Sequence, residues 1–130
     1  MTDFKFREFP SIENYLTVAD DLNKERIAFL DDSPQPHNWV VTEKIDGSNI
    51  GLYISKHDWA IAKRTCFVTD DHDLNNVRVY AREQLMPVIK AIQSFMNENE
   101  RCILYGEFYG LGIQNRVYYG PGKQFKFFHV

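Results

Sequence analysis

Hydrophobic and polar residues alternate along two neighbouring stretches in the first half of the chain. The alternation covers residues 39–45 and resumes over residues 50–55, with the period of two that is typical of a half-buried β-strand. The sequence DGSN, residues 46–49, lies between them and has the composition of a tight turn. The pattern therefore predicts a hairpin, with Lys44 fixed at the end of its first strand.

The other segments show either this period or that of a helix, about 3.6 residues. Residues 13–30 place apolar positions among charged ones and predict an amphipathic helix. From residue 77 to residue 95 the apolar positions follow a helical rhythm, and Pro87 divides this run into two predicted pieces. Further strands are predicted at residues 59–64, 102–110 and 123–130, the last two separated by a glycine-rich loop.

The composition bounds the class of protein. A chain of 130 residues, 44% of them hydrophobic, is long enough for one domain with a buried core. The apolar runs are short and the start, MTDFKFREFP, lacks a secretory signal, so we expect no membrane partner and a cytoplasmic location. Cys66 and Cys102 are predicted to be reduced core residues. The net charge of −3 disfavours a generally basic surface but leaves a local basic site open.

The run Lys44-Ile45-Asp46-Gly47 has the pattern Lys-x-Asp-Gly, which suits one kind of chemistry. Three fixed residues at this spacing occur by chance in about 2 of 100 chains of this length, so a plain turn is the alternative. A lysine attacks a phosphate only as the neutral amine, which requires a low-dielectric or cationic neighbourhood and a rigid mount. A strand end beside a turn supplies such a mount, and Lys44 is the candidate nucleophile.

Three other residues have the chemistry to hold a nucleotide. Arg64 has the planar fork that binds phosphate or ribose oxygens, although a solvated arginine at a sheet edge is the simpler interpretation. Glu107, in LYGEFYG, is placed to hold a ribose hydroxyl or metal-bound water, or to form an ordinary salt bridge. Phe128 shares a strand face with Lys126 while its phenylalanine neighbours point to a core, so it stacks on a base or simply packs.

Other patterns indicate ordinary structure. The sequence GPGK at residues 120–123 lacks the Walker spacing and predicts a turn. The histidines show no paired metal-ligand spacing, and the acidic run at residues 70–73 predicts a solvated loop rather than a metal site.

Taken in order, these segments resemble the RNA ligase 2 family, the nick-sealing ligases typified by the phage T4 enzyme, within the covalent nucleotidyltransferase superfamily. FREFPSIENY is similar to the family's N-terminal segment, EKIDGSN to motif I and AKRT to the arginine segment downstream. YGEFYGLGIQNRVYYG is similar to motif III with its extension, and FKFFHV to motif IIIa. The resemblance implies an α+β fold of largely antiparallel sheets with flanking helices. It would be a single, partial nucleotidyltransferase (ATP-grasp-like) domain over residues 1–130.

The resemblance also implies roles for the residues that match. Lys44 would be the nucleophile that forms a lysyl-AMP phosphoramidate from ATP. Its neighbours Glu43 and Ile45 would belong to the ATP site, with Glu43 helping to place the adenine. Asn49 and Arg64 would act on phosphate or ribose and on the RNA 3′ end.

Two more roles complete the implied ATP site: Glu107 would contact the ribose, and Phe128 would stack on the adenine. In the family mechanism AMP then passes to an RNA 5′-phosphate, which a 3′-hydroxyl attacks, with Mg²⁺ or Mn²⁺ stabilising the transition state. The implied activity is that of an ATP-dependent RNA ligase, with the ends of a nicked RNA duplex as substrate.

The chain departs from the family pattern in two respects. His129 stands where motif IIIa commonly has an acidic residue. The 130 residues also contain no counterpart of motifs IV and V, whose metal-site and phosphate contacts are often worth ~3–4 kcal/mol for a single group. We therefore expect a truncated form or an N-terminal fragment of a ligase, with low activity on its own.

Several alternatives share these features. DNA ligases and capping guanylyltransferases contain Lys-x-Asp-Gly but lack the GIQ extension found here at residues 112–114. In a split enzyme, a second chain would supply motifs IV and V. A non-catalytic nucleotide-binding or RNA-binding remnant is the alternative from a different functional class.

Overall fold

The structure is a computed structural model, and it describes residues 4–10, 16–18, 27–29 and 42–130. The chain divides into two compact units, one of residues 10–43 and the other of residues 1–9 together with 44–130.

In the smaller unit, β1 (Leu16–Val18) pairs antiparallel with β2 (Ile27–Phe29). The helix predicted over residues 13–30 is therefore wrong at both strands, and its other residues lie outside the described part of the chain. Both strands contain β-branched residues, which favour an extended backbone. The apolar spacing of residues 13–30 suits a helix, but the preference of β-branched residues for an extended backbone favours the two strands.

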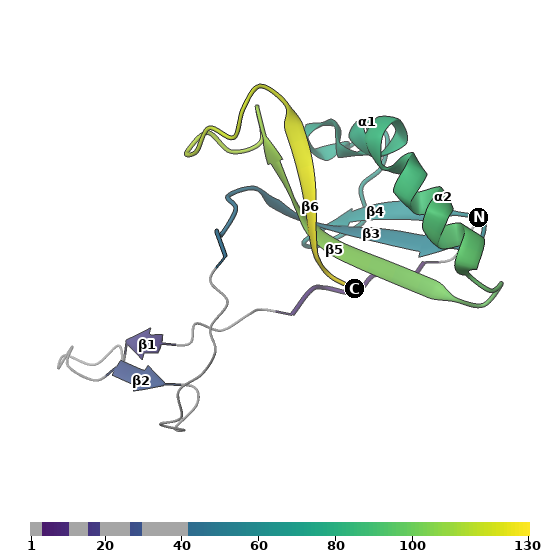
Figure 1. The fold of residues 1–130 in the computed structure, drawn as a ribbon, viewed down its shortest axis with the longest axis horizontal. Helices are drawn as coiled ribbons and strands as arrows, with labels where there is room; N and C mark the ends of the chain where they lie inside the picture. The colour runs from purple at the N-terminus through teal and green to yellow at the C-terminus, as the bar shows by residue number, and fades with distance from the viewer. Residues whose placement is uncertain (1–3, 11–15, 19–26, 30–41) are drawn as a thin grey trace. The chain divides into compact units, whose positions relative to one another are not determined.

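The larger unit is built on one four-stranded antiparallel sheet (Figure 1). Its order is β4-β3-β5-β6. The strands are β3 (Ser48–Ser55), β4 (Trp59–Lys63), β5 (Arg101–Gly110) and β6 (Lys123–His129). The strands predicted from residues 50, 59, 102 and 123 are thus confirmed to within two residues at each end. Together with the helices below, they confirm the predicted α+β class.

The hairpin predicted around the sequence DGSN is wrong. Residues 42–46 form no strand, and Ser48 and Asn49 begin β3 instead of forming a turn. These two residues pair with β5, which runs alongside the whole of β3, whereas β4 pairs only with its later part. Lys44 therefore lies ahead of the sheet on a segment that no strand pairing holds. Residues 39–41 lie outside the described part of the chain.

Helical residues cover one face of the sheet (Figure 1). They are η1 (Leu74–Asn76), α1 (Val77–Tyr80), the π-helical turn η2 (Ala81–Leu85) and α2 (Met86–Phe95). The first predicted piece corresponds to α1 with η2 and the second to α2, and the two form one continuous run. Pro87 lies in the first turn of α2, and the wider turn before it accommodates the missing N–H. No helix in the described part of the chain is long and apolar enough to span a membrane.

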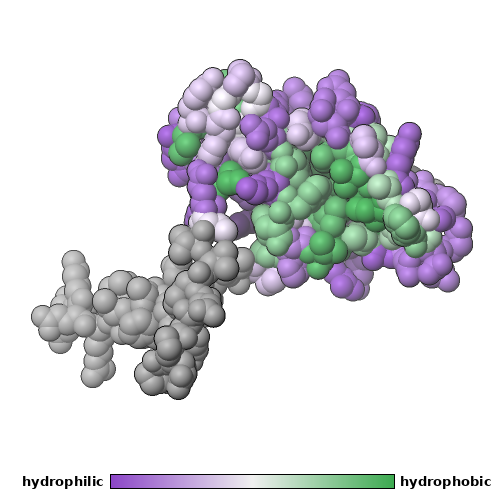
Figure 2. All heavy atoms as spheres, viewed as in Figure 1, coloured by the Kyte–Doolittle hydropathy of each residue, from purple (hydrophilic) through white to green (hydrophobic). Residues whose placement is uncertain are grey.

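The core lies between these helices and the sheet. Ile50, Leu52 and Ile54 alternate along β3 and are fully buried against helical residues that include Val77 and Ile89. Figure 2 shows that hydrophobic surface gathers over the part of the unit where β5, β6 and α2 lie, with hydrophilic residues around it. The alternation of β3 thus sends one set of side chains to the helices and the other to the second face, meaning the sheet face opposite the helices.

Two sequence features outside the core have local explanations. Cys102 packs half-buried against the core, as predicted, but Cys66 is exposed, so the prediction is wrong for Cys66. Cys66 lies in the tight turn after β4, where side chains point to solvent. In the acidic run, Asp70 forms salt bridges with Arg78 at 2.8 Å and Arg82 at 2.7 Å, which lower its pKa.

The second face carries an N-terminal segment, residues 4–9, at one end. The hydroxyl of Tyr53 accepts a hydrogen bond from the backbone N–H of Arg7 and donates one to its carbonyl, both at 2.9 Å. The hydroxyl of Tyr105 donates to the same carbonyl at 2.9 Å. Phe9 adds a ring contact with Tyr105 at 4.9 Å. The candidate site adjoins this segment on the same face, at the next pair, Asn49 and Glu107.

Candidate active site

Residues from three strands meet on the second face, and two of them, Asn49 and Glu107, are predicted site residues. Asn49 on β3 lies directly opposite Glu107 on β5, and Glu107 lies opposite Lys126 on β6. Directly opposed residues project to the same side of a sheet, so these three side chains are neighbours. Arg64 follows β4 in a tight hairpin loop. The strand pairing thus brings a carboxylate, an amide and basic groups to one end of the sheet.

Glu107 is where the charges of the site act together. Its pKa is raised, chiefly because partial burial removes water from the carboxylate, and the negative charge of Asp46 adds to the rise. A hydrogen bond from the backbone of Gly47 and the positive charges of Arg64 and Lys44 oppose it. Two separate segments, residues 44–47 and the loop that carries Arg64, therefore lie close enough to one half-buried carboxylate to change its proton affinity.

Gly47 brings the segment that carries Lys44 against β5. A β-carbon at Gly47 would meet the carbonyl oxygen of Phe108 and would lie 2.8 Å from the Cβ of Tyr109. It would also lie 3.1 Å from the Cγ of Glu107. The glycine of Lys-x-Asp-Gly is therefore needed for a close backbone approach rather than for a turn. Lys44 itself is exposed at the edge of the site.

Asp46 is held by the loop that joins β5 to β6, residues 111–122. Arg116 donates from Nε to one carboxylate oxygen at 2.9 Å and from Nη2 to the other at 2.7 Å. The backbone N–H of Asp46 donates to the hydroxyl of Tyr119 at 2.8 Å. The Asp46 side chain is 23% exposed and that of Arg116 is 76% exposed. The loop therefore holds Asp46, the residue between Ile45 and Gly47, through both its side chain and its backbone.

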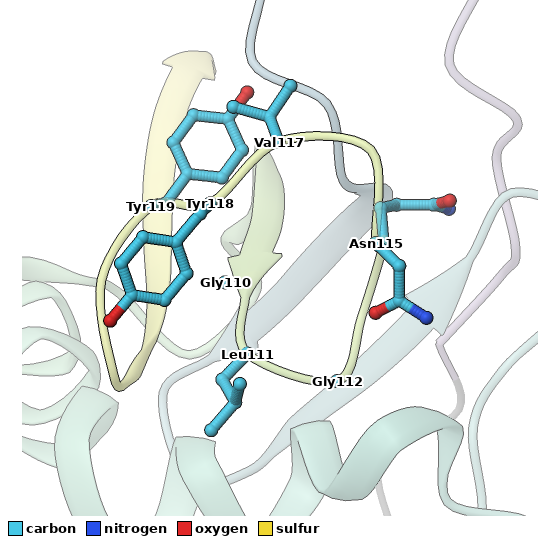
Figure 3. A pocket seen from close by; sticks show the side chains of 8 residues that line it. Gly110, Leu111, Gly112, Asn115, Val117, Tyr118 and Tyr119 are labelled. Atoms are coloured by element: carbon cyan, nitrogen blue, oxygen red, sulfur yellow. The ribbon is translucent and has the colours of Figure 1, made fainter.

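The same loop forms a small pocket (Figure 3). Its lining comes from one continuous stretch of chain and consists of Gly110, Leu111, Gly112, Gln114, Asn115, Val117, Tyr118 and Tyr119. In the view of Figure 3, the two tyrosine rings and Val117 lie on one side and Asn115 on the other. Aromatic and amide groups thus gather beside the residues that hold Asp46.

Phe128 lies on the second face, as predicted. Phe125 and Phe127 are half-buried against the core, whereas Phe128 is 51% exposed. A β-bulge opposite Tyr105 and Gly106 places Phe128 between two paired residues of β6. Its ring contacts that of Phe9 at 5.4 Å, and about half of the side chain stays available to a ligand.

The other predicted residues have fewer defined contacts. Glu43 is exposed and belongs to the smaller unit, and Ile45 is half-buried. Their contacts with ATP remain predictions. His129 lies opposite Tyr105 and contacts the ring of Phe9 at 5.6 Å. An aromatic contact thus occupies the position where the resemblance leads to an acidic residue.

Sequence reasoning missed the two residues that hold Asp46. Arg116 and Tyr119 belong to the extension of motif III, but the Arg116–Asp46 pair joins residues 70 positions apart. No local period or motif links such distant positions. The aspartate of Lys-x-Asp-Gly was the one available signal. Its negative charge calls for a positively charged partner, and that partner is Arg116.

A family model described as RNA ligase matches residues 37–130. The match covers most of the chain and includes Lys-x-Asp-Gly, the Arg64 hairpin, β5 and β6. The chain therefore belongs to the RNA ligase family. The resemblance inferred from the sequence is confirmed at this level, and it supports a general RNA ligase role.

The fit of Gly47 against β5 is testable by substitution. We expect Gly47→Ala to destabilise the protein by about 1–3 kcal/mol, because the new methyl group meets a strand carbonyl that cannot move without breaking sheet pairing. Urea denaturation measures the change. Gly122→Ala is the matched control, since a β-carbon there would meet nothing within 4 Å. Equal stability of both variants would contradict the close approach.

The raised pKa of Glu107 predicts a pH-dependent cost of folding. Because the folded state binds the proton more tightly than the unfolded state, the cost is absent below the ordinary pKa of 4.5 and grows as pH rises through the folded pKa. We expect Glu107→Gln to be more stable than wild type at neutral pH, with the difference vanishing in acid. Denaturation at several pH values measures this, and Glu83→Gln on the exposed surface of η2 corrects for the loss of one carboxylate. A gain that is the same at every pH would exclude ionisation as its cause.

Proposed function

We propose that this chain acts in ATP-dependent joining of RNA ends, with Lys44 as the nucleophile that carries AMP. One observation supports this most strongly: the segment that carries Lys44 packs through Gly47 against the half-buried Glu107, which lies opposite Asn49 at one end of the sheet. A nucleophile, a phosphate-binding cation and a carboxylate in one place are what nucleotide transfer requires. The family match gives the general ligase role within which this chemistry falls.

In the first step, the neutral Nζ of Lys44 attacks the α-phosphorus of ATP. The new P–N bond replaces the bond from that phosphorus to the bridging oxygen, and pyrophosphate leaves. The amine loses a proton to solvent. Arg64 would bind phosphate oxygens; it directly follows β4, and its positive charge acts on Glu107, which supports this role. Asn49, beside Glu107 on the second face, would donate to phosphate or ribose.

The nucleoside would lie along the second face. Glu107 accepts a hydrogen bond from the ribose, and the exposed half of Phe128 stacks on the adenine. Glu43 and Ile45 flank Lys44 in the sequence and complete the proposed ATP site. Each of these roles uses a chemical group that matches its partner in the nucleotide.

A divalent cation, Mg²⁺ or Mn²⁺, would arrive with the nucleotide. Among the described residues, no three His, Cys, Asp or Glu side chains converge as a metal cage. This fits a cation that takes most of its ligands from phosphate oxygens and water, with one or two carboxylates from the protein. Glu107 is the candidate, since Arg116 already occupies both oxygens of Asp46. The cation would supply neutralisation of phosphate charge.

The RNA steps follow from the same adduct. An oxygen of the RNA 5′-phosphate attacks the adenylyl phosphorus, the P–N bond breaks, and Lys44 recovers a proton. The 3′-hydroxyl of the other end then attacks the RNA phosphorus, a phosphodiester forms, and AMP leaves. We further propose that motifs IV and V, supplied by a further segment or a second chain, add phosphate and metal contacts to these steps.

The covalent step is tested with α-labelled ATP and Mg²⁺. We expect an acid-labile, alkali-stable label on the chain, weak when it is assayed alone and stronger when a polypeptide with motifs IV and V is added. Lys44→Ala and Lys44→Arg should both abolish the label, because an alanine has no amine and a guanidinium stays protonated. Lys90→Arg, on the helical layer, is the matched control and should label like wild type.

Three results would overturn this assignment. Label that persists in both Lys44 variants would place the nucleophile elsewhere. Absence of label from every form, with and without the added polypeptide, would favour a nucleotide-binding role without catalysis. Labelling by GTP in preference to ATP would instead indicate chemistry of the capping type.

Stacking by Phe128 predicts a measurable loss of nucleotide affinity. We expect Phe128→Ala to weaken ATP binding by about 1–3 kcal/mol, the usual range for a base stacked on an aromatic side chain. Calorimetric titration with ATP and Mg²⁺ measures it. Phe95→Ala removes a phenylalanine that is 88% exposed on α2 and should leave binding unchanged. Equal affinity of wild type and Phe128→Ala would remove the stacking role.

A further inference from the structure

The segment Lys44–Gly47 needs a mount that the sheet does not provide. Strand pairing begins only at Ser48, so the backbone around Lys44 has no ladder to fix it. An attacking amine must nevertheless be held within a fraction of an ångström of its line of approach. The side-chain contacts of this segment therefore show what holds it.

Arg116 fixes the carboxylate of Asp46, two residues from Lys44. Its Nε and Nη2 engage different oxygens, at 2.9 and 2.7 Å, so the carboxylate cannot rotate without losing one bond. Because most of the Arg116 side chain is exposed, water weakens the attraction. The value of the pair therefore lies in its geometry more than in its contribution to stability.

Tyr119 fixes the backbone at the same residue. Its hydroxyl accepts the N–H of Asp46 at 2.8 Å, and its ring packs edge-on against that of Tyr109 at 5.0 Å. Tyr109 belongs to β5 and donates its own hydroxyl to Gln124 of β6 at 3.0 Å. The position of Tyr119 is thus tied to two strands of the sheet.

The loop that carries both residues is closed at its base. The backbone N–H of Leu111 donates to the carbonyl of Gly122 at 3.2 Å. Gly110 has a φ of +113°, and a β-carbon there would meet the same carbonyl, so the closure depends on glycine. The loop is thus closed where it leaves β5 and enters β6, and two of its side chains contact Asp46.

We propose that Arg116 and Tyr119 are positioning residues that fix the Lys44–Gly47 segment for attack by Lys44. The proposal rests on the function proposed above, but the mechanical part of it, the fixing of Asp46, does not depend on catalysis. Neither residue touches the reacting atoms: both act through Asp46. Their removal should lower the rate of adduct formation at saturating ATP and leave ATP affinity unchanged.

The first arm of the test measures hydrogen exchange at the Asp46 amide by NMR. We expect Tyr119→Phe and Arg116→Ala each to speed this exchange roughly 3- to 10-fold, the effect of losing about one hydrogen bond. Arg82→Ala is the matched control, since it removes an arginine paired with an aspartate on the helical layer. Exchange that is unchanged in both loop variants overturns the proposal, whether or not the chain is active.

The second arm measures the rate of labelling by α-labelled ATP across ATP concentrations, with the motif IV and V polypeptide present. We expect both variants to label more slowly at saturating ATP with the same half-saturating concentration. Arg116→Lys, which keeps the charge without the fork, should recover only part of the rate. A lower ATP affinity with a normal saturated rate overturns the positioning role. Failure of wild type to label would count against the proposed function, and the exchange arm would still decide whether the loop fixes Asp46.

Discussion

The pairing of β3 with β5 is the interaction on which the rest of the larger unit depends. It runs the full length of β3, from Ser48 to Ser55, and each pair has two consequences. On one face it buries Ile50 and Leu52 beneath the helices, and on the other it sets Asn49 beside Glu107. A slip of one residue would exchange the two faces and would move the core and the site together. Stability and function therefore specify the same register.

The Lys44–Gly47 segment also lies against β5, although it is not part of the strand pairing. It precedes Ser48, the first paired residue of β3, and it stays close to β5 because Gly47 has no side chain. The loop after β5 also holds Asp46 through Tyr119 and Arg116. One strand thus contributes to the site three times: through Glu107, through the surface on which Gly47 rests and through the loop that follows it. Because β5 makes all three contributions, residues that are far apart in the sequence meet at one place.

The sequence was informative where a residue's environment follows from its neighbours. Apolar and polar residues alternate in the sequence over residues 50–55 and 59–63, and this alternation predicted β3 and β4 to within two residues. It failed at DGSN, whose composition suits a turn, because the pairing of Ser48 and Asn49 with β5 is a long-range choice. The contact between Arg116 and Asp46 was invisible for the same reason. Long-range contacts leave no period in a single sequence, although the family resemblance placed both segments near one site.

The hydrogen bonds from Tyr53 and Tyr105 attach the N-terminal segment to the sheet. Both hydroxyls bind the main chain of Arg7. One of these bonds requires a backbone N–H at position 7, which proline lacks, so proline there would break the bond to Tyr53. Loss of either tyrosine hydroxyl would also remove a bond that holds the segment. The N-terminal segment is thus attached to the sheet through the main chain of one residue and the side chains of two others.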